Sequence, residues 1–352
     1  MYKTKIVSAA AAVALAAPSA FAQTPSVSIW GIADLGVAAL NFKQTGSKSF
    51  LVGDAGYGGN RLGFKAEQAL SNGLKAQANF EAGLNLDNNV YGNMFWTRQA
   101  NLGLTGDFGT VVAGTDYSLS FLAAYRGEYC GWCGIASPAA MSRQGVRTGD
   151  YLKYTSPDFG GFSFGVARAF GQGNDNSGGE VPNTGPGQKS PSGNEIAAFY
   201  SGGPVNAAAS YRDNQLLSGP RVKDYYLAGN VAFGAMKVYV LLGGAQSNEP
   251  TRSVDEAYTN IGLGFKLGET DLNLQYGMAK DKAAAASANT STLMAVSVFH
   301  PLAKNIHAYA QFGSLRNDAN VSRQPYIGSG SMPTAPAGTT VSGAIVGMRY
   351  VF

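Results

Sequence analysis

The sequence predicts an all-β fold, a 16-stranded antiparallel transmembrane β-barrel. Three observations lead to this prediction. Apolar and polar residues alternate with a period of two in several segments, almost no helical period competes with them, and short turn signals alternate with longer polar loops. The composition agrees, because only 14% of the 352 residues are charged and 47 are glycine, whereas an average soluble domain has about 25% charged residues and about 7% glycine.

The composition also excludes several classes of protein. The 26 basic and 22 acidic residues give a formal net charge of +4, too little over this length for a nucleic-acid-binding surface. A helical membrane protein needs apolar runs of about 18 residues, and we find none beyond the N-terminus. Low charge combined with 45% hydrophobic residues argues against a disordered chain and against a typical cytosolic enzyme.

The first 22 residues predict a Sec signal peptide. Lys3 and Lys5 precede an apolar stretch, and Ala20-Phe21-Ala22 supplies a small-residue cleavage pattern. A membrane anchor fits less well, because the apolar stretch is short and Pro18 interrupts it. Cleavage would leave a mature chain of residues 23–352, exported from the cytoplasm, and would lower the net charge from +4 to +2 by removing two lysines.

The strand predictions rest on alternation. Each segment places apolar or small residues on one face and polar residues on the other, as strands do when their two faces meet different surroundings. The clearest are 74–81, 260–267, 271–278 and 305–312. The last residues, 346–352, alternate in the same way and end on Phe352, which places an aromatic ring at a membrane interface. A terminal Phe on an ordinary strand is the alternative.

The turns set the strand number. Seven short turns join fourteen strands, and one strand at each end makes sixteen. Short turns that alternate with long loops are typical of outer-membrane barrels, whereas a soluble sandwich has no reason to gather its long loops at one end. Sixteen strands leave a water-filled lumen. The short turns are predicted at 70–73, 106–108, 157–161, 202–204, 234–235, 268–269 and 301–304, and the long loops at 41–58, 117–148, 171–194 and 316–339.

Eight segments of the chain carry a resemblance to a known family: 26–34, 61–65, 70–76, 80–81, 98–104, 107–110, 154–162 and 347–352. In these segments the chain resembles the Gram-negative general porins of the neisserial and β-proteobacterial type. This resemblance implies a homotrimeric, 16-stranded diffusion pore in the outer membrane, in contact with lipid and lipopolysaccharide, that passes small ions and solutes. It also implies a third external loop, here about residues 116–150, that folds inward to narrow the channel.

The resemblance further implies a basic cluster at the constriction, at Arg61, Arg98 and Arg147, opposed by the acidic residues Asp116 and Glu128 of the loop. Rings of charge select ions, so we expect a weak preference for anions. The alternative for each arginine is a solvated position on a loop or rim.

Alternation supports the arginines unequally. Arg61 falls on the polar, lumen-facing side of its strand, as do Lys65, Lys75 and Glu81. Arg98 shares its parity with apolar residues and is predicted to face lipid, unless a β-bulge or a position near the rim intervenes, because an arginine at mid-bilayer costs about 2–4 kcal/mol.

Cys130 and Cys133 depart from the family, which usually lacks cysteine. We expect a local disulfide that stiffens the constriction loop. A reduced or metal-binding pair is the alternative, although two cysteines cannot complete a tetrahedral zinc site, and redox catalysis lacks a βαβ context.

Enzymatic function is not expected. His300 and His307 are the only histidines, neither lies in a recognisable catalytic motif, and no nucleotide-binding or zinc-protease motif is present. No cofactor, metal or nucleic-acid partner is therefore predicted. The competing hypotheses are a secreted all-β binding or adhesion protein and, less well supported, a barrel hydrolase.

Overall fold

The computed structural model describes residues 25–54, 56–87, 96–130, 133–142, 145–171, 192–215, 220–249, 253–283, 289–327 and 335–352. The predicted signal peptide, residues 1–22, lies outside the described residues.

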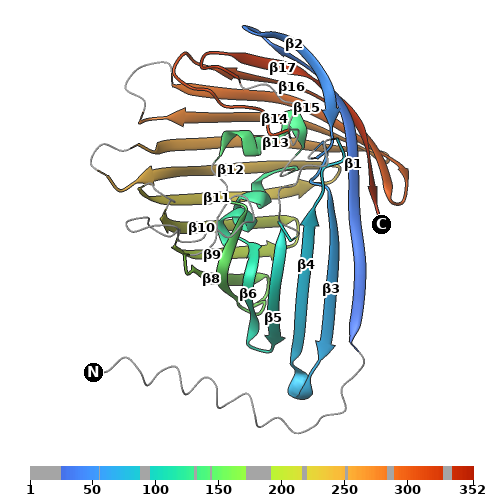
Figure 1. Cartoon of the computed structure of the whole chain (residues 1–352), viewed down its shortest axis with the longest axis vertical. Coiled ribbons are helices and arrows are strands. Elements are labelled where there is room, and N and C mark those ends of the chain that lie inside the picture. Colours follow the sequence, from blue (N-terminus) through green and yellow to red (C-terminus); the bar gives the residue numbers. More distant parts are fainter. Residues whose placement is uncertain are drawn as a thin grey trace.

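Within this part of the chain, sixteen antiparallel strands close into a barrel (Figure 1), which confirms the predicted fold class. Successive strands are hydrogen-bonded neighbours, and β1 (Ser26–Phe42) closes the ring by pairing with both β3 and β17. The other strands of the ring are β3 (Arg61–Ala69), β4 (Lys75–Gly83), β5 (Gln99–Gly106), β6 (Gly109–Tyr117), β7 (Arg147–Thr155), β8 (Phe162–Ala169), β9 (Gly193–Gly202), β10 (Val205–Gln215), β11 (Arg221–Phe233), β12 (Met236–Ser247), β13 (Asp255–Leu267), β14 (Thr270–Asp281), β15 (Thr290–Ala303), β16 (Ile306–Asn317) and β17 (Thr340–Val351).

One further strand, β2 (Gly46–Val52), lies where a loop was predicted. It forms a hairpin with the end of β1, and its first four residues are exposed. Because both faces of this outer part meet solvent, the segment has no reason to alternate apolar and polar residues. The sequence of β2 therefore lacks the period-two alternation by which the other strands were predicted.

All seven predicted short turns join consecutive strands. Five of them contain a glycine with a positive φ, for example Gly234 and Gly268 with φ values of 58° and 62°, which strain a residue with a Cβ atom. The short turns gather at one end of the barrel, and the longer connections gather at the other. This is the asymmetry of outer-membrane barrels, whose short turns face the periplasm.

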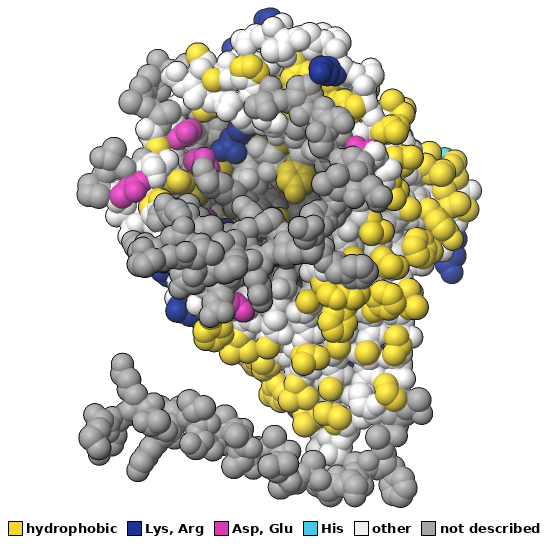
Figure 2. All heavy atoms as spheres, in the orientation of Figure 1, with side chains coloured by type: hydrophobic (Ala, Val, Ile, Leu, Met, Phe, Trp, Pro, Cys, Tyr) yellow, Lys and Arg dark blue, Asp and Glu magenta, His cyan; other side chains and the backbone are white. Residues whose placement is uncertain are grey.

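The outer surface is apolar, as alternation predicts. Val346, Met348 and Tyr350 of β17 are exposed. Figure 2 shows hydrophobic side chains gathered over the lower right of this face, where no acidic side chain is visible. Exposed aromatic rings near the short turns correspond to an interfacial girdle. They include Phe108, Phe159, Phe162, Phe233 and the terminal Phe352.

The connection between β6 and β7 folds into the barrel (Figure 1). It contains α2 (Leu119–Ala124) and three single turns of 3₁₀ helix, η3 (Tyr125–Gly127), η4 (Gly134–Ala136) and η5 (Pro138–Met141). Helix α2 packs against β8–β11, whereas η4 and η5 pack against β13–β17. None of the helices in the described ranges is long and apolar enough to cross a membrane.

Candidate pore constriction

The structure brings the three predicted arginines together around one tyrosine. Arg61 is the first residue of β3, Arg98 directly precedes β5, and Arg147 is the first residue of β7. Arg98 Nη2 donates to the hydroxyl oxygen of Tyr117 at 3.0 Å, and Arg61 Nη1 donates to the same oxygen at 3.4 Å. The Arg147 guanidinium lies 5.1 Å from the centroid of the Tyr117 ring.

One carboxylate lies inside this cluster. Glu81 of β4 is almost fully buried, and its Oε1 accepts from Arg98 Nε and lies 3.6 Å from Arg61 Nη1. The Tyr117 hydroxyl donates to Glu81 Oε1 at 3.3 Å. The five side chains, which we call the Tyr117 cluster (Arg61, Glu81, Arg98, Tyr117 and Arg147), therefore carry three positive charges and one negative charge.

The prediction that Arg98 faces lipid is wrong. Leu102 of β5 points outward and is 67% exposed, but Arg98 is only 5% exposed and contacts Glu81 and Tyr117. Arg98 precedes the first residue of β5, and its backbone N–H donates to the Glu81 carbonyl at 3.0 Å. Strict alternation of faces ends where the strand ends, so the parity of β5 does not apply to Arg98.

Tyr117 was not among the predicted residues. A β-bulge between Gly114 and Asp116 interrupts the pairing of β6 with β7 just before it. A bulge inserts one residue and redirects the side chains that follow, so period-two reasoning could not orient this ring. The only available signal was an aromatic residue at the start of a long loop.

Asp116 lies in β6 rather than in the loop, which differs from the prediction. Its Oδ2 forms a buried salt bridge with Lys153 Nζ at 2.7 Å, and its Oδ1 accepts from Gln99 Nε2 at 2.7 Å. Strands β6 and β7 extend further than expected, so the inward connection spans residues 118–146. Asp116 therefore belongs to the barrel wall, and Lys153 neutralises its charge. It does not oppose the arginines from the loop, as the prediction had it.

The remaining predicted residues lie elsewhere. Glu128 is buried in the loop directly after η3 and lines a separate hollow. Lys65 and Lys75 both pair with Glu67, at 3.2 and 2.7 Å, in the half of β3 and β4 nearer the short turn. Cys130 and Cys133 are joined by a disulfide.

Buried polar contacts hold the loop inside the barrel. The Ser118 hydroxyl caps α2 by accepting from Phe121 N at 3.0 Å, and it donates to the Gly145 carbonyl at the other end of the loop. The backbone N–H of Ser120 donates to Glu195 Oε2 of β9 at 2.9 Å. These contacts join both ends of the loop and fix its first helix to the wall.

A fourth cation, Arg349 of β17, lies over the ring of Tyr57 with 4.8 Å from its guanidinium carbon to the ring centroid. Tyr57 belongs to the connection between β2 and β3, which folds inward because Asp34 Oδ2 accepts from the backbone N–H groups of Tyr57 and Gly58 at 2.6 and 2.9 Å. Alternation could have found Arg349, since it has the parity opposite to the exposed Tyr350.

The described segments contain no group of three His, Cys, Asp or Glu side chains that could hold a metal ion. Of the two histidines, His300 Nδ1 lies 2.9 Å from the Thr270 hydroxyl, at the exposed short-turn end of β15.

Comparisons with known proteins agree with this architecture. The family model for Gram-negative porins matches residues 9–320. The outer membrane porin protein 32 of Delftia acidovorans is 28% identical over 368 residues, covering 97% of this chain and 98% of the relative. The major outer membrane protein P.IB of Neisseria gonorrhoeae is 34% identical over 123 residues, covering 32% of each chain.

Two solved structures show the same fold. The anion-selective porin from Comamonas acidovorans superposes with a TM-score of 0.76 at 21% identity, covering 94% of this chain and all of that one. The trimer form of OmpT from Vibrio cholerae gives a TM-score of 0.65 at 16% identity, with 94% and 100% coverage. From the match of the family model over most of its length, the chain belongs to the family of Gram-negative porins.

Proposed function

We propose that the protein is a passive diffusion channel of the outer membrane that admits small hydrophilic solutes and ions, with a weak preference for anions. The observation that carries this proposal is the Tyr117 cluster, in which three arginines gather around Tyr117 and Glu81 at the side of a lumen that an inward loop has narrowed. Arg61, Arg98 and Arg147 would act as the positive wall of the constriction.

The expected preference is modest. With the carboxylate of Asp54, which interacts electrostatically with Arg98, and that of Glu81, the three arginines leave an excess of one positive charge. At about 8 Å from a passing ion, this charge stabilises an anion and destabilises a cation by about 0.5 kcal/mol each in a water-like dielectric, so the two differ by about 1 kcal/mol, or about fivefold. Salt weakens this effect, because the Debye length is about 10 Å at 0.1 M ionic strength. The similarity to a porin described as anion-selective supports the same sign.

Reversal potentials in planar bilayers test the proposal. With a tenfold gradient of KCl across a membrane that contains the purified protein, we expect a potential whose sign shows chloride to be more permeant than potassium. A cation-selective channel would contradict the anion preference and leave the channel itself intact. Absence of any conductance would contradict the channel.

We also propose that the signal peptide is removed after Ala22 and that the mature barrel forms a homotrimer surrounded by lipid and lipopolysaccharide. The strands β3–β6 have 8 or 9 residues, whereas β11–β14 have 12 or 13. A membrane-spanning strand needs about 9–11 residues, so the short side of the barrel is better covered by protein than by lipid.

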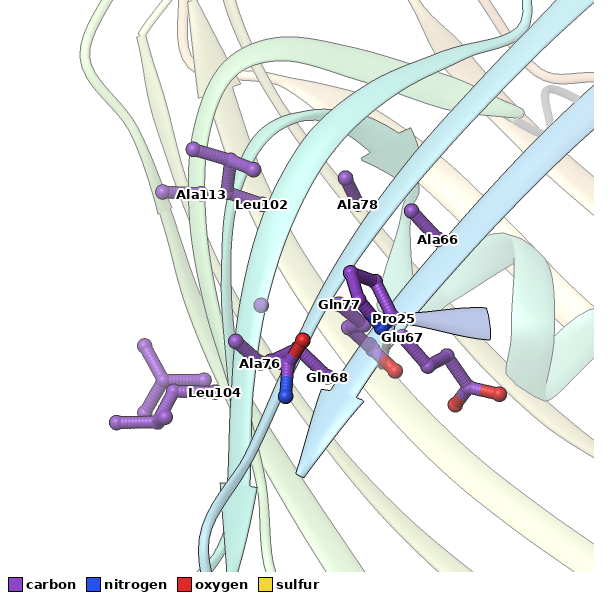
Figure 3. Close-up of a pocket in the computed structure, with 12 residues that line it drawn as sticks. Pro25, Ala66, Glu67, Gln68, Ala76, Gln77, Ala78, Leu102, Leu104 and Ala113 are labelled. Carbon is purple, nitrogen blue, oxygen red and sulfur yellow. The ribbon is translucent and has the colours of Figure 1, made fainter. Parts of the chain in front are cut away.

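The outer face of this short side is shaped for close approach. It has an apolar hollow of about 490 Å³ (Figure 3), floored by small side chains and bordered by larger ones. Such a surface lets another backbone pack closely. The alanines are Ala66, Ala76, Ala78 and Ala113, and the bordering residues are Leu102, Leu104 and Val111. Native gels and mass spectrometry of the membrane fraction would give the subunit number and the N-terminal residue, which we expect to be Gln23.

A further inference from the structure

A second hollow lies below the Tyr117 cluster, toward the short turns. It has a volume of about 550 Å³ and lies between the inward loop and the wall. Asn206 follows the turn between β9 and β10, and Lys237 follows the turn between β11 and β12, so the hollow opens toward the periplasmic end. Its volume falls in the range of small-molecule sites, which is about 300–1,000 Å³.

Two cations line this hollow. Arg126 of the loop donates from Nη1 to the Ser201 hydroxyl at 2.8 Å and to Asn206 Oδ1 at 3.4 Å. Lys237 Nζ lies 5.3 Å from the centroid of the Tyr239 ring. Among the described residues, neither cation has a carboxylate within 4.0 Å. Partly buried cations that form no salt bridge attract an anion, because no carboxylate in direct contact neutralises their charge.

Aromatic rings form much of the remaining lining. Tyr129 and Tyr239 meet edge to face with 5.9 Å between their centroids, and Phe199 lies 5.2 Å from the Arg126 guanidinium. Burial raises the pKa of the Tyr129 hydroxyl, so this side chain stays neutral. The rings therefore offer a flat apolar ligand a surface on which it can stack.

The charge of the hollow limits the ligand. Glu128 also lines it, so two cations and one carboxylate leave a single positive charge. Ring faces and one net positive charge suit a ligand that combines an aromatic ring with one carboxylate. We propose that this hollow is a binding site for aromatic monocarboxylates, with the carboxylate between Arg126 and Lys237 and the ring against Tyr129 and Tyr239. The proposal rests on the proposed channel function, which delivers the ligand to this site.

The test uses single channels of the full-length protein in planar bilayers, with benzoate as the probe. Bound benzoate narrows the path, so we expect it to reduce the chloride current in a saturable way. Acetate lacks the ring and benzamide lacks the charge, so both should block the current less than benzoate does. Lys237→Gln should raise the half-blocking benzoate concentration about tenfold, since a hydrogen bond to a charged group contributes about 1.5–3 kcal/mol. Arg126→Gln removes the other cation and provides a second variant should Lys237→Gln fail to insert.

Lys282→Gln is the matched control, because it removes the same charge from an exposed position in a long connection. It should leave the benzoate block unchanged. Equal block by acetate and benzoate, or an unchanged block in both lining variants, would overturn the aromatic carboxylate site. A wild-type channel that conducts with an anion preference and ignores benzoate would overturn this site alone, whereas loss of conductance would count against the channel function.

Discussion

The hydroxyl of Tyr117 accepts a hydrogen bond from Arg98 Nη2 at 3.0 Å, and this contact joins the residue that directly precedes β5 to the last residue of β6. The same oxygen also accepts from Arg61 and donates to Glu81. A single neutral group thus holds two guanidinium groups near a shared carboxylate. The guanidinium groups of Arg61 and Arg98 repel each other, so their close approach depends on their contacts with Tyr117 and Glu81.

Arg61→Glu should shift the channel toward cations. The substitution changes the charge of the Tyr117 cluster by two, which removes the positive excess and reverses or abolishes a preference of about fivefold. Reversal potentials under a KCl gradient measure the shift. Lys282→Glu makes the same change at an exposed outer position, and an equal shift in that variant would mean that Arg61 is not at the constriction.

Tyr117→Phe should destabilise the folded barrel while keeping its anion preference. The variant removes the hydroxyl that contacts Arg98, Arg61 and Glu81, and an unsatisfied buried polar group costs about 1–3 kcal/mol. Heat-dependent gel mobility and urea unfolding measure the loss. Tyr225→Phe, on an outward-facing and exposed ring, is the control and should unfold as the wild type does.

Lys153→Met should lower the stability of the barrel more than Asp116→Asn, the substitution of its salt-bridge partner. It leaves the Asp116 carboxylate buried without its counter-ion, and breaking a buried pair costs about 3–5 kcal/mol. Asp116 keeps its contact with Gln99, which favours the lower end of this range. The double variant Asp116→Asn with Lys153→Met removes both charges and should recover part of the lost stability in urea unfolding. Strict additivity would show that the two side chains do not interact.

Ala78→Trp should weaken the trimer and preserve the barrel. The new ring fills the hollow on the outer face of β4, where we propose that a neighbouring subunit packs. Lipid tolerates a tryptophan, so Ala209→Trp on the exposed outer face of β10 serves as the control. Native gels should show more monomer for Ala78→Trp only. If the trimers of both variants dissociate at the same temperature as the wild-type trimer, the interface lies on another face.

The sequence determined the barrel because its alternation reports a property that each strand carries locally. Residues such as Val346, Met348 and Tyr350 must meet an apolar exterior wherever the strand stands in the ring, and the parity that exposes them turns Arg349 inward. Glycine, proline and polar residues mark the short turns in the sequence, and the number of these turns predicts the number of strands. Family resemblance, not periodicity, singled out Arg98 and Arg147.

Only the tertiary structure decided how the site is assembled. Arg98 turns inward because its strand has not yet begun, and Tyr117 reaches the arginines because a bulge redirects it. Lys153 neutralises Asp116 from the neighbouring strand, and the inward loop carries Arg126 to the wall that holds Lys237. Each of these outcomes depends on strand ends, bulges or the path of a loop. The physical reason is that period-two patterning fixes the face of a side chain only within a regular strand, whereas contacts across the lumen are fixed by closure of the ring and by the way the loop packs inside it.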